Sequence, residues 1–289
     1  MESNNINGRY GHNNPQALNI EDVEKYTLAD YGLTVDAVKI NHFGIDITDP
    51  RTGEHLPDAF YKAKLEAAVA QAEKMLDIVI LPRLLSEHHD FYSNDYQSYT
   101  FIHTFHKPIL QVEAVRLEYG AGTLYSYPTK WWRVYNLPGH LQMLPNTLLS
   151  GGSDGLSLAM AYTQYPMVSG IPATVGNNYA PQMMHVEYVA GMLPPTRSGV
   201  TKPNEMHPDL WQMIVKIAVK EVFEQWGRLI IGAGIANMTI SIDGVSQSID
   251  TTQSAMYGGA SADIVQLNED IKELYTGLKS YYGTNVGLI

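Results

Sequence analysis

The spacing of apolar residues along the chain predicts three long helices, with a stretch of strands between the first two. Residues 58–76 carry apolar side chains at helical spacing, with an alanine-rich flank that permits close packing. Residues 207–229 show the same period and have Pro208 in the first turn, a position that proline favours. A third helical pattern covers residues 261–282, and Gly283 is placed to end it.

The third helix has a narrow apolar seam. Its apolar residues are spaced alternately three and four positions apart, the pattern that one helix presents to another. The seam consists of Ile264, Leu267, Ile271, Leu274, Leu278 and Tyr281. A shorter helix is predicted over residues 19–33, with Asn19 as its cap and Gly32 at its end.

Between residues 96 and 200 the period shortens to two, which is typical of half-buried strands. The stretch PILQVEAVRLEYGAGTLYSYP predicts two strands joined by a turn at Gly120–Gly122. KWWRVY, HLQML and MMHVEYVAGM predict further strands, separated by glycine and proline residues. The sequence therefore predicts an antiparallel β-rich block inserted between the first two long helices.

The segment TISIDGVSQSI, residues 239–249, predicts a β-hairpin around Asp243-Gly244, a pair that suits a two-residue type I′ turn. Such a turn fixes the register, so one face of the hairpin carries only hydroxyl side chains. These are Thr239, Ser241, Ser246 and Ser248. A lone hairpin is marginal in water, so this one either lies on a larger body with a solvated outer face or pairs with neighbouring chains.

Together these patterns predict an α+β fold. A helical core, with helices near 58–76, 207–229 and 261–282, holds an inserted antiparallel β-rich block and a projecting β-hairpin. The predicted parts, in chain order, are a polar mobile arm (1–18), an N-terminal helical part (19–95), the β-rich block (96–200), a core helix (201–235), and a segment with the hairpin, the terminal helix and a tail (236–289).

Composition adds limits on the class of protein. The 289-residue chain is 45% hydrophobic, as expected of a packed globular protein, and it has no cysteine, which excludes disulfides and thiolate chemistry. No apolar run approaches the roughly 20 residues that a membrane span needs, and the N-terminal residues lack the pattern of a signal peptide. We therefore expect a soluble, non-secreted protein with no membrane partner.

The chain is acidic, with a net charge of −11 from 30 acidic and 19 basic residues. Sequence-independent affinity for DNA comes from lysine and arginine side chains that neutralise phosphates. The surface of an acidic chain instead repels DNA, so we do not expect a protein that recognises a DNA sequence.

The sequence predicts no catalytic, cofactor or metal site. The EHH run at Glu87–His89 and the HTFH run at His103–His106 invite a metal interpretation, but two histidines three apart on a strand point to opposite faces, and no HExxH order is present. IGAGIA at 231–236 lacks the context of a dinucleotide fingerprint because it follows a helix.

Adjacent strand residues alternate, so of Trp131 and Trp132 we expect one in the core and one at a rim or subunit contact.

The order of these pieces resembles that of a known family. An alanine-rich helix (AFYKAKLEAAVAQAEKML) precedes FHKPILQVEAVRLEYGAG, then a strand block ends in HVEYVAGMLPP, and the helix HPDLWQMIVKIAVKEVFEQW follows. Over residues 58–227 this order is similar to that of the head-tail connector, or adaptor, proteins of tailed bacteriophages. The matching positions are Tyr188, Ala190, Gly191, Pro208 and Trp211, the last being a tryptophan where the family more usually has an aliphatic residue.

The resemblance implies a non-enzymatic virion protein of the neck at the capsid vertex, assembled in the host cytoplasm. It implies a homo-oligomeric ring, a dodecamer, that docks beneath the portal protein and receives a downstream neck or tail protein. Genomic DNA would pass through the bore without sequence-specific binding. Two alternatives stay open: another neck or tail-completion protein, such as a stopper or tail terminator, or a glycan-binding or hydrolytic virion protein that uses Trp131 and Tyr135.

Two sets of residues are candidates for the contacts of such a ring. For the contact between subunits, we expect the hydroxyl face of the hairpin (Thr239, Ser241, Ser246, Ser248) and the helical seam (Ile264, Leu267, Ile271, Leu274, Leu278). The aromatic and apolar C-terminus is expected to dock on the portal through Tyr281, Tyr282, Val286, Leu288 and Ile289. The alternative is that this tail folds back on its own subunit.

Overall fold

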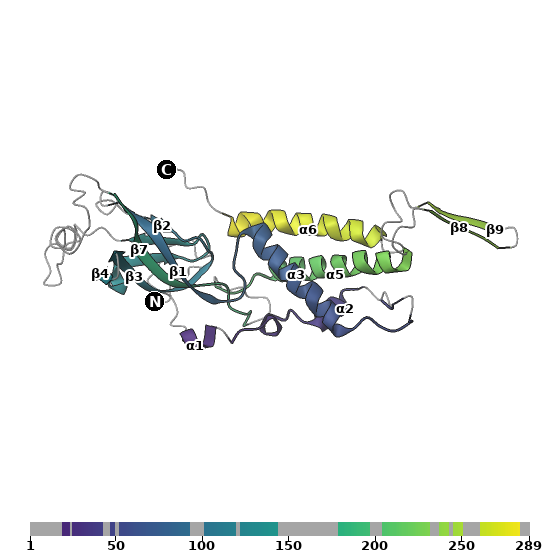
Figure 1. Cartoon of the computed structure of the whole chain (residues 1–289), viewed down its shortest axis with the longest axis horizontal. Helices are drawn as coiled ribbons and strands as arrows, with labels where there is room; N and C mark the ends of the chain where they lie inside the picture. The colour runs from purple at the N-terminus through teal and green to yellow at the C-terminus, as the bar shows by residue number, and fades with distance from the viewer. Residues whose placement is uncertain are drawn as a thin grey trace. The chain divides into compact units, whose positions relative to one another are not determined.

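The computed structural model (Figure 1) describes residues 19–23, 25–42, 47–49, 52–92, 101–119, 122–143, 179–196, 204–231, 237–242, 245–250 and 261–283. The predicted arm (1–18) and the turns at Gly120 and Asp243-Gly244 lie outside these residues. The chain divides into two compact units. Unit 1 comprises Met1–Tyr26, Asp77–Glu205 and Thr284–Ile289, and unit 2 comprises Thr27–Leu76 and Met206–Gly283. Helices and antiparallel sheets are both present, which confirms the α+β class.

Unit 2 is helical and is organised around its longest helix. Its elements are a 3₁₀ helix η1 (Leu28–Tyr31), helices α2 (Val35–Ile40), α3 (Asp58–Leu76), α5 (Pro208–Ile231) and α6 (Ser261–Tyr282), and strands β8 (Asn237–Ile242) and β9 (Val245–Asp250). Helix α5 contacts α2, α3 and α6, as Figure 1 shows. The predicted helices at 58–76 and 261–282 are confirmed, and the helix predicted at 207–229 runs from Pro208 to Ile231.

Helix α5 is buried on several sides because it lies among three other helices. Small residues on α3, Ala68 and Ala72, are fully buried and let the two helices approach closely. Among the α5 residues whose burial is described, the buried apolar ones are Leu210, Met213, Ile214, Val215, Ile217, Ala218, Val219, Val222 and Phe223. Trp226 is only half-buried, and its Nε1 donates to the carbonyl of Thr48 at 2.9 Å.

The seam of α6 is covered by the chain itself, which corrects the expectation that it forms a contact between subunits. Its buried members are Ile264, Leu267, Ile271 and Leu278, whereas Leu274 is half-buried. They pack in unit 2 against α5, and an ion pair between Lys216 Nζ and Asp270 Oδ2, 2.5 Å long, joins the same two helices. A heptad-like seam indicates that a helix has a helical partner, but it does not indicate which chain supplies that partner.

The single helix predicted over 19–33 is wrong. A four-residue helix α1 (Ile20–Val23) ends early, and η1 begins separately after Thr27. The side chain of Asp30 accepts from the backbone N–H of Thr27 at 2.7 Å, so the local hydrogen bonds of these polar residues favour a new start over a continuous helix. Gly32, with φ of 70°, ends this 3₁₀ turn as predicted.

In unit 1 the described strands form two antiparallel sheets, and the larger buried core lies between them. The first has the strand order β1 (Arg83–Tyr92), β7 (Tyr179–Ala190), β3 (Ile109–Tyr119) and β4 (Gly122–Ser126). The second has the order β2 (Phe101–His103), β6 (His140–Met143) and β5 (Trp132–Tyr135). Strand β1 lies in the segment 19–95 that the sequence assigns to a helical part, so strand structure begins earlier than the predicted boundary at residue 96.

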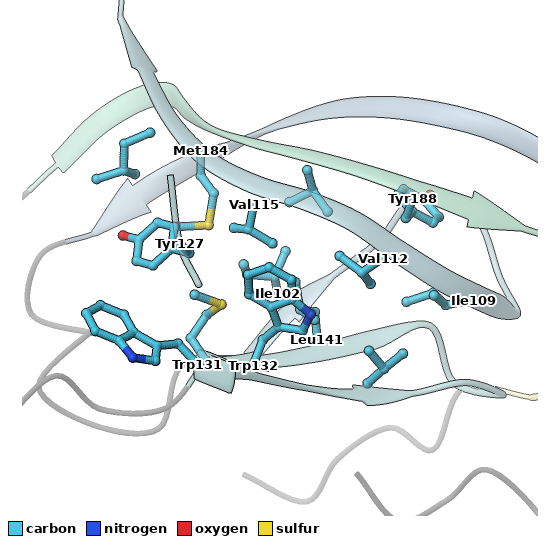
Figure 2. Close-up of a cluster of buried hydrophobic side chains, with 14 of the residues drawn as sticks. Ile102, Ile109, Val112, Val115, Tyr127, Trp131, Trp132, Leu141, Met184 and Tyr188 are labelled. Carbon is cyan, nitrogen blue, oxygen red and sulfur yellow. The ribbon is translucent and has the colours of Figure 1, made fainter. Parts of the chain in front are cut away.

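The core of unit 1 fills the space between these sheets (Figure 2). Val112, Val115, Met184 and Tyr188 come from the four-stranded sheet, and Ile102, Trp132 and Leu141 come from the three-stranded sheet; all are buried. Trp131 and Trp132 are both in this core, at 4% and 1% exposure, so the expected division between core and rim is wrong. The reason is that Trp131 ends a 3₁₀ helix η3 (Thr129–Trp131), where strand alternation does not apply.

Among the described helices, none combines the length and the apolar character needed to span a membrane.

We predict that Gly191→Ala destabilises unit 1. Gly191 has φ of 133°, and an added Cβ would lie 2.6 Å from the Cα of Pro82, a backbone atom that cannot move aside cheaply. The expected loss is roughly 2–4 kcal/mol of unfolding free energy. Urea unfolding followed by tryptophan fluorescence measures it, because Trp131 and Trp132 belong to the same unit.

The matched control is Gly122→Ala, where an added Cβ meets no atom within 4 Å. We expect this control to change the unfolding free energy by less than about 0.5 kcal/mol. Equal effects of the two substitutions would contradict the steric argument at Gly191.

Candidate functional site

The hairpin is the first candidate site, and its register is the predicted one. Ile242 pairs with Val245, Ser241 with Ser246 and Thr239 with Ser248. In this register Thr239, Ser241, Ser246 and Ser248 occupy alternate, paired positions of the two strands. Strands β8 and β9 form a sheet of two strands, and within the described residues no third strand joins either edge.

The predicted docking tail is placed only in part. Tyr282 is 1% exposed, and its hydroxyl lies 3.3 Å from the backbone N–H of His207, at the start of α5. Tyr281 packs against the His207 ring, with centroids 5.0 Å apart. Tyr282 therefore belongs to the core of unit 2, which corrects its assignment to a partner contact. Val286, Leu288 and Ile289 lie outside the described residues.

A second candidate is a group of polar side chains on the four-stranded sheet, on the face opposite its core. In the register of β7 with its two neighbours, both His88 of β1 and Arg116 of β3 lie opposite His185. Glu118 follows two residues after Arg116, so it lies on the same face. Three strands that are distant in sequence thus bring two imidazoles, a carboxylate and a guanidinium together.

His185 is the centre of this group. It is 8% exposed, its ring stacks on that of His88 with centroids 4.5 Å apart, and its Nε2 lies 2.7 Å from Ser86 Oγ. Its Nδ1 lies 3.1 Å from Glu118 Oε2. His185, His88 and Glu118 thus bring together nitrogen and oxygen atoms of the kinds that can ligate a cation.

Glu118 is held in place from its other side. Thr123 Oγ1 donates to Glu118 Oε1 at 3.1 Å, and Arg116 Nη1 lies 3.9 Å from the same oxygen. Burial by itself would raise the pKa of Glu118, but His185, Thr123 and Arg116 outweigh burial and lower the pKa. The carboxylate is therefore ionised at neutral pH, with Oε2 directed at the histidine.

On the opposite face of the same sheet, Glu87 forms a buried polar cluster. Glu87 is 6% exposed, and its Oε2 accepts from His89 Nε2 at 3.1 Å and from the backbone N–H of Phe105 at 3.0 Å. Its Oε1 accepts from His106 Nδ1 at 3.0 Å and from the Tyr188 hydroxyl. An ionised carboxylate only accepts hydrogen bonds, so each histidine nitrogen that faces Glu87 carries a proton.

These hydrogen bonds control the ionisation of the cluster. Burial by itself would raise the pKa of Glu87, but the bonds from His89, His106, Tyr188 and Phe105 outweigh it and lower the pKa to about 2. Burial and the bond to Glu87 raise the pKa of Tyr188. Glu87 is thus a stable anion that links β1 to β7 and to the loop after β2. This is a structural role, because a general acid or base in catalysis needs a pKa near the working pH.

Sequence reasoning missed both clusters. Spacing within the runs Glu87–His89 and His103–His106 does not reveal them, because Tyr188, Glu118 and His185 come from other strands. Glu87 and Tyr188 are 101 residues apart, and Glu118 and His185 are on different strands as well. His103 joins neither cluster, because its ring packs edge-on against His140, 4.1 Å away. The one sequence signal was strand alternation, which sends Glu87 and His88 to opposite faces.

No protein-family model and no curated protein matches this chain.

We predict that Glu87→Gln destabilises unit 1 and removes a pH dependence. A fall in the pKa from 4.5 to about 2 corresponds to about 3 kcal/mol of unfolding free energy. Because the pKa of the folded state lies below that of the unfolded state, this contribution is fully present above about pH 4.5 and is lost as the pH falls toward 2. Urea unfolding of both proteins between pH 2 and 7 measures it.

Glu66→Gln is the control, since Glu66 is largely exposed and its pair with Lys62 is 4.0 Å long. We expect it to cost at most about 0.5 kcal/mol at any pH in this range. If Glu87→Gln were as mild as Glu66→Gln, the hydrogen bonds to Glu87 would not stabilise the fold.

Proposed function

We propose that this chain is a structural virion protein, a ring-forming head-tail adaptor that docks beneath the portal and forms part of the DNA conduit. The proposal starts from the resemblance in the order of helix, strand block and proline-initiated helix. The structure has a feature that suits ring assembly independently of that resemblance. This feature is the ribbon β8–β9, which follows α5 and precedes α6 in the chain.

The two open edges of this ribbon are the observation that carries the proposal. Strands β8 and β9 pair only with each other within the described chain, so each has an outer edge of backbone groups without strand partners. An isolated two-stranded hairpin is marginally stable, and open edges pair readily with other strands. Pairing between copies of this chain satisfies both edges at once.

The two edges of the ribbon are different surfaces, as contacts around a closed ring require. A closed ring needs two different surfaces on each subunit, so that one surface contacts the preceding copy and the other the following copy. The outer edge of β8 on one copy and the outer edge of β9 on the next form such a pair. A closed set of ribbons would be a barrel, which leaves no edge open.

The charge of the chain suits a conduit. With a net charge of −11 on each copy, a ring repels the phosphates of DNA that pass through it. A wall that holds DNA off by repulsion lets it move without binding, whereas a basic wall would retain it. Binding of DNA in a sequence-specific manner is accordingly not part of the proposal.

The glycan-binding alternative loses its main residue. A sugar platform needs an exposed aromatic face, and Trp131 lies in the core between the two sheets (Figure 2). Tyr135 is half-buried and donates its hydroxyl to Gln142 Oε1 at 3.1 Å. The described residues therefore favour the structural role over this alternative.

We predict that the ribbon is required for the ring. Residues 237–250 are replaced by a short glycine-serine linker, and the variant is mixed with the portal protein and imaged by negative-stain electron microscopy. The portal is included because an adaptor can remain monomeric until the portal templates it. The expected result is a folded subunit, by circular dichroism, that forms no ring.

The matched control is the double substitution Ser241→Ala and Ser246→Ala, which keeps the backbone of the ribbon. Rings are expected to persist in this control, since edge pairing uses backbone groups. Rings with a central bore that form without the ribbon would remove the proposed role of β8 and β9.

We further predict that portal docking depends on the residues after Gly283. Truncation after Gly283 removes Val286, Leu288 and Ile289 but keeps Tyr282, which is buried in unit 2. Loss of apolar anchors typically costs several-fold to hundredfold in affinity, so we expect about tenfold or weaker portal binding in a pull-down or surface plasmon resonance assay. Thermal stability should be unchanged.

A chain with Thr284→Ala and Asn285→Ala serves as the control, because it keeps the three apolar residues. It should bind the portal like the unmodified protein. Unchanged binding of the truncated chain would instead favour a tail that packs on its own subunit or has no role.

A further inference from the structure

Three side chains that can each ligate a metal ion meet on the outer face of the four-stranded sheet, on three different strands. They are His88 of β1, His185 of β7 and Glu118 of β3, and one ligand atom from each lies within 4.8 Å of the other two. All three belong to unit 1, so their arrangement depends on the register of one sheet. The Glu87 cluster on the other face shares none of them.

We propose that His88, His185 and Glu118 bind one divalent transition-metal ion, with Zn²⁺ the best match. Two imidazole nitrogens and one carboxylate oxygen form a donor set that suits zinc and its neighbours in the first transition series. Mg²⁺ and Ca²⁺ prefer oxygen ligands throughout and are not suited to it. A water molecule would complete a tetrahedral site.

The spacing of two of the ligands already suits such an ion. Ligand atoms about 2.0–2.1 Å from a tetrahedral ion lie about 3.3 Å from each other. His185 Nδ1 and Glu118 Oε2 are 3.1 Å apart. A cation bound by both atoms would therefore require little movement of this pair.

His185 Nδ1 also lacks another way to be satisfied. The atom is buried and has no hydrogen-bond partner within the described part of the chain, and the carboxylate oxygen Oε2 of Glu118 lies 3.1 Å from it. A buried polar atom without a partner costs free energy, which is why such atoms are rare in native proteins. A metal ion at Nδ1 removes that cost.

Neighbouring residues orient the ligands as metal sites require. The second nitrogen of His185 is held by Ser86 Oγ at 2.7 Å, which leaves Nδ1 for the ion. Thr123 holds Oε1 of Glu118 at 3.1 Å and so leaves Oε2 toward His185. Outer hydrogen bonds of this kind fix ring tautomer and carboxylate orientation in known metal sites.

The third ligand must move to complete the site, and its position allows this. His88 is exposed and stacks flat on His185, an arrangement in which the two rings do not point at a common ion. An exposed histidine changes its side-chain rotamer at low cost. Rotation of His88 out of the stack directs a nitrogen to the space beside His185 Nδ1 and Glu118 Oε2.

The charge near the site does not oppose a cation. Arg116 is the adjacent positive group, and its Nη1 is paired with Glu187 Oε1 at 2.9 Å. With neutral histidines, Glu118, Glu187 and Arg116 together leave one negative charge. The ion would link β1 to β7 and β3, so we expect it to stabilise this sheet, which goes beyond the proposed role in ring assembly and is independent of it.

The test uses the full-length, tag-free protein stripped of metal with a chelator and then dialysed. Isothermal titration with ZnCl₂ should show one ion bound per chain, and excess Zn²⁺ should raise the melting temperature by about 5 °C at a hundredfold excess over Kd. MgCl₂ should do neither. Addition of Co²⁺ should give the visible absorption of a tetrahedral N/O site.

His88→Ala tests the assignment with little risk to folding, because the side chain is exposed. We expect it to weaken Zn²⁺ binding about tenfold or more, and Glu118→Gln to do the same. His103→Ala is the matched control, an exposed strand histidine on the other sheet, and should bind like the unmodified chain. Absence of Zn²⁺ binding, or binding that His88→Ala leaves unchanged, would overturn the proposal; ring formation is not needed for either readout.

Discussion

The register of β7 against β1 and β3 is the constraint on which the rest of unit 1 depends. It places Glu87, Val186 and Val115 in line on the face toward the three-stranded sheet. On the other face it places His88, His185 and Arg116 in line. A slip of one residue would exchange these sets and carry Val115 and Val186, both fully buried, into water. The burial of the core thus selects one register, and both polar clusters result from it.

The two clusters differ because the faces differ in what covers them. Glu87 lies beneath the loop that contains Phe105 and His106, so it is removed from water and must be satisfied by protein donors. Its four donors are all present, which makes the cluster a fixed link between strands. The cluster around His185 is less complete: His88 is exposed, and Nδ1 of His185 has no hydrogen bond within the described residues. An incomplete polar group at a partly open position has room for a ligand, whereas a complete and buried one does not.

The sequence predicts features that depend on nearby residues and misses those that depend on distant ones. The helices at 58–76 and 261–282 follow from apolar period and from the end signal at Gly283, and the hairpin register follows from the two residues of its turn. Strand β1 was missed because its sequence, RLLSEHHDFY, has no clear apolar alternation, since Glu87 and the histidines occupy strand positions on both faces. The predicted division of Trp131 and Trp132 between core and rim is wrong for a related reason: the short helix η3 cannot be recognised from the strand pattern around it. The metal-ligand candidates come from three strands, and one sequence without its fold cannot bring them together.

The helices that pack on α5 limit which surfaces of this chain can form contacts in the proposed ring. Because α5 is apolar on several sides, one neighbour cannot bury it, and α2, α3 and α6 all pack on it within unit 2. The seam of α6 is used for this purpose, and Tyr282 at its end is used as well. Neither can be offered to a second chain without exposing α5 itself, at a cost of about 25 cal/mol for each Å² of apolar surface. Between α5 and α6, by contrast, the ribbon β8–β9 has backbone edges that the described chain leaves without a strand partner. The proposed assembly of this protein therefore rests on backbone pairing at the ribbon, which follows α5 and precedes α6 in the chain.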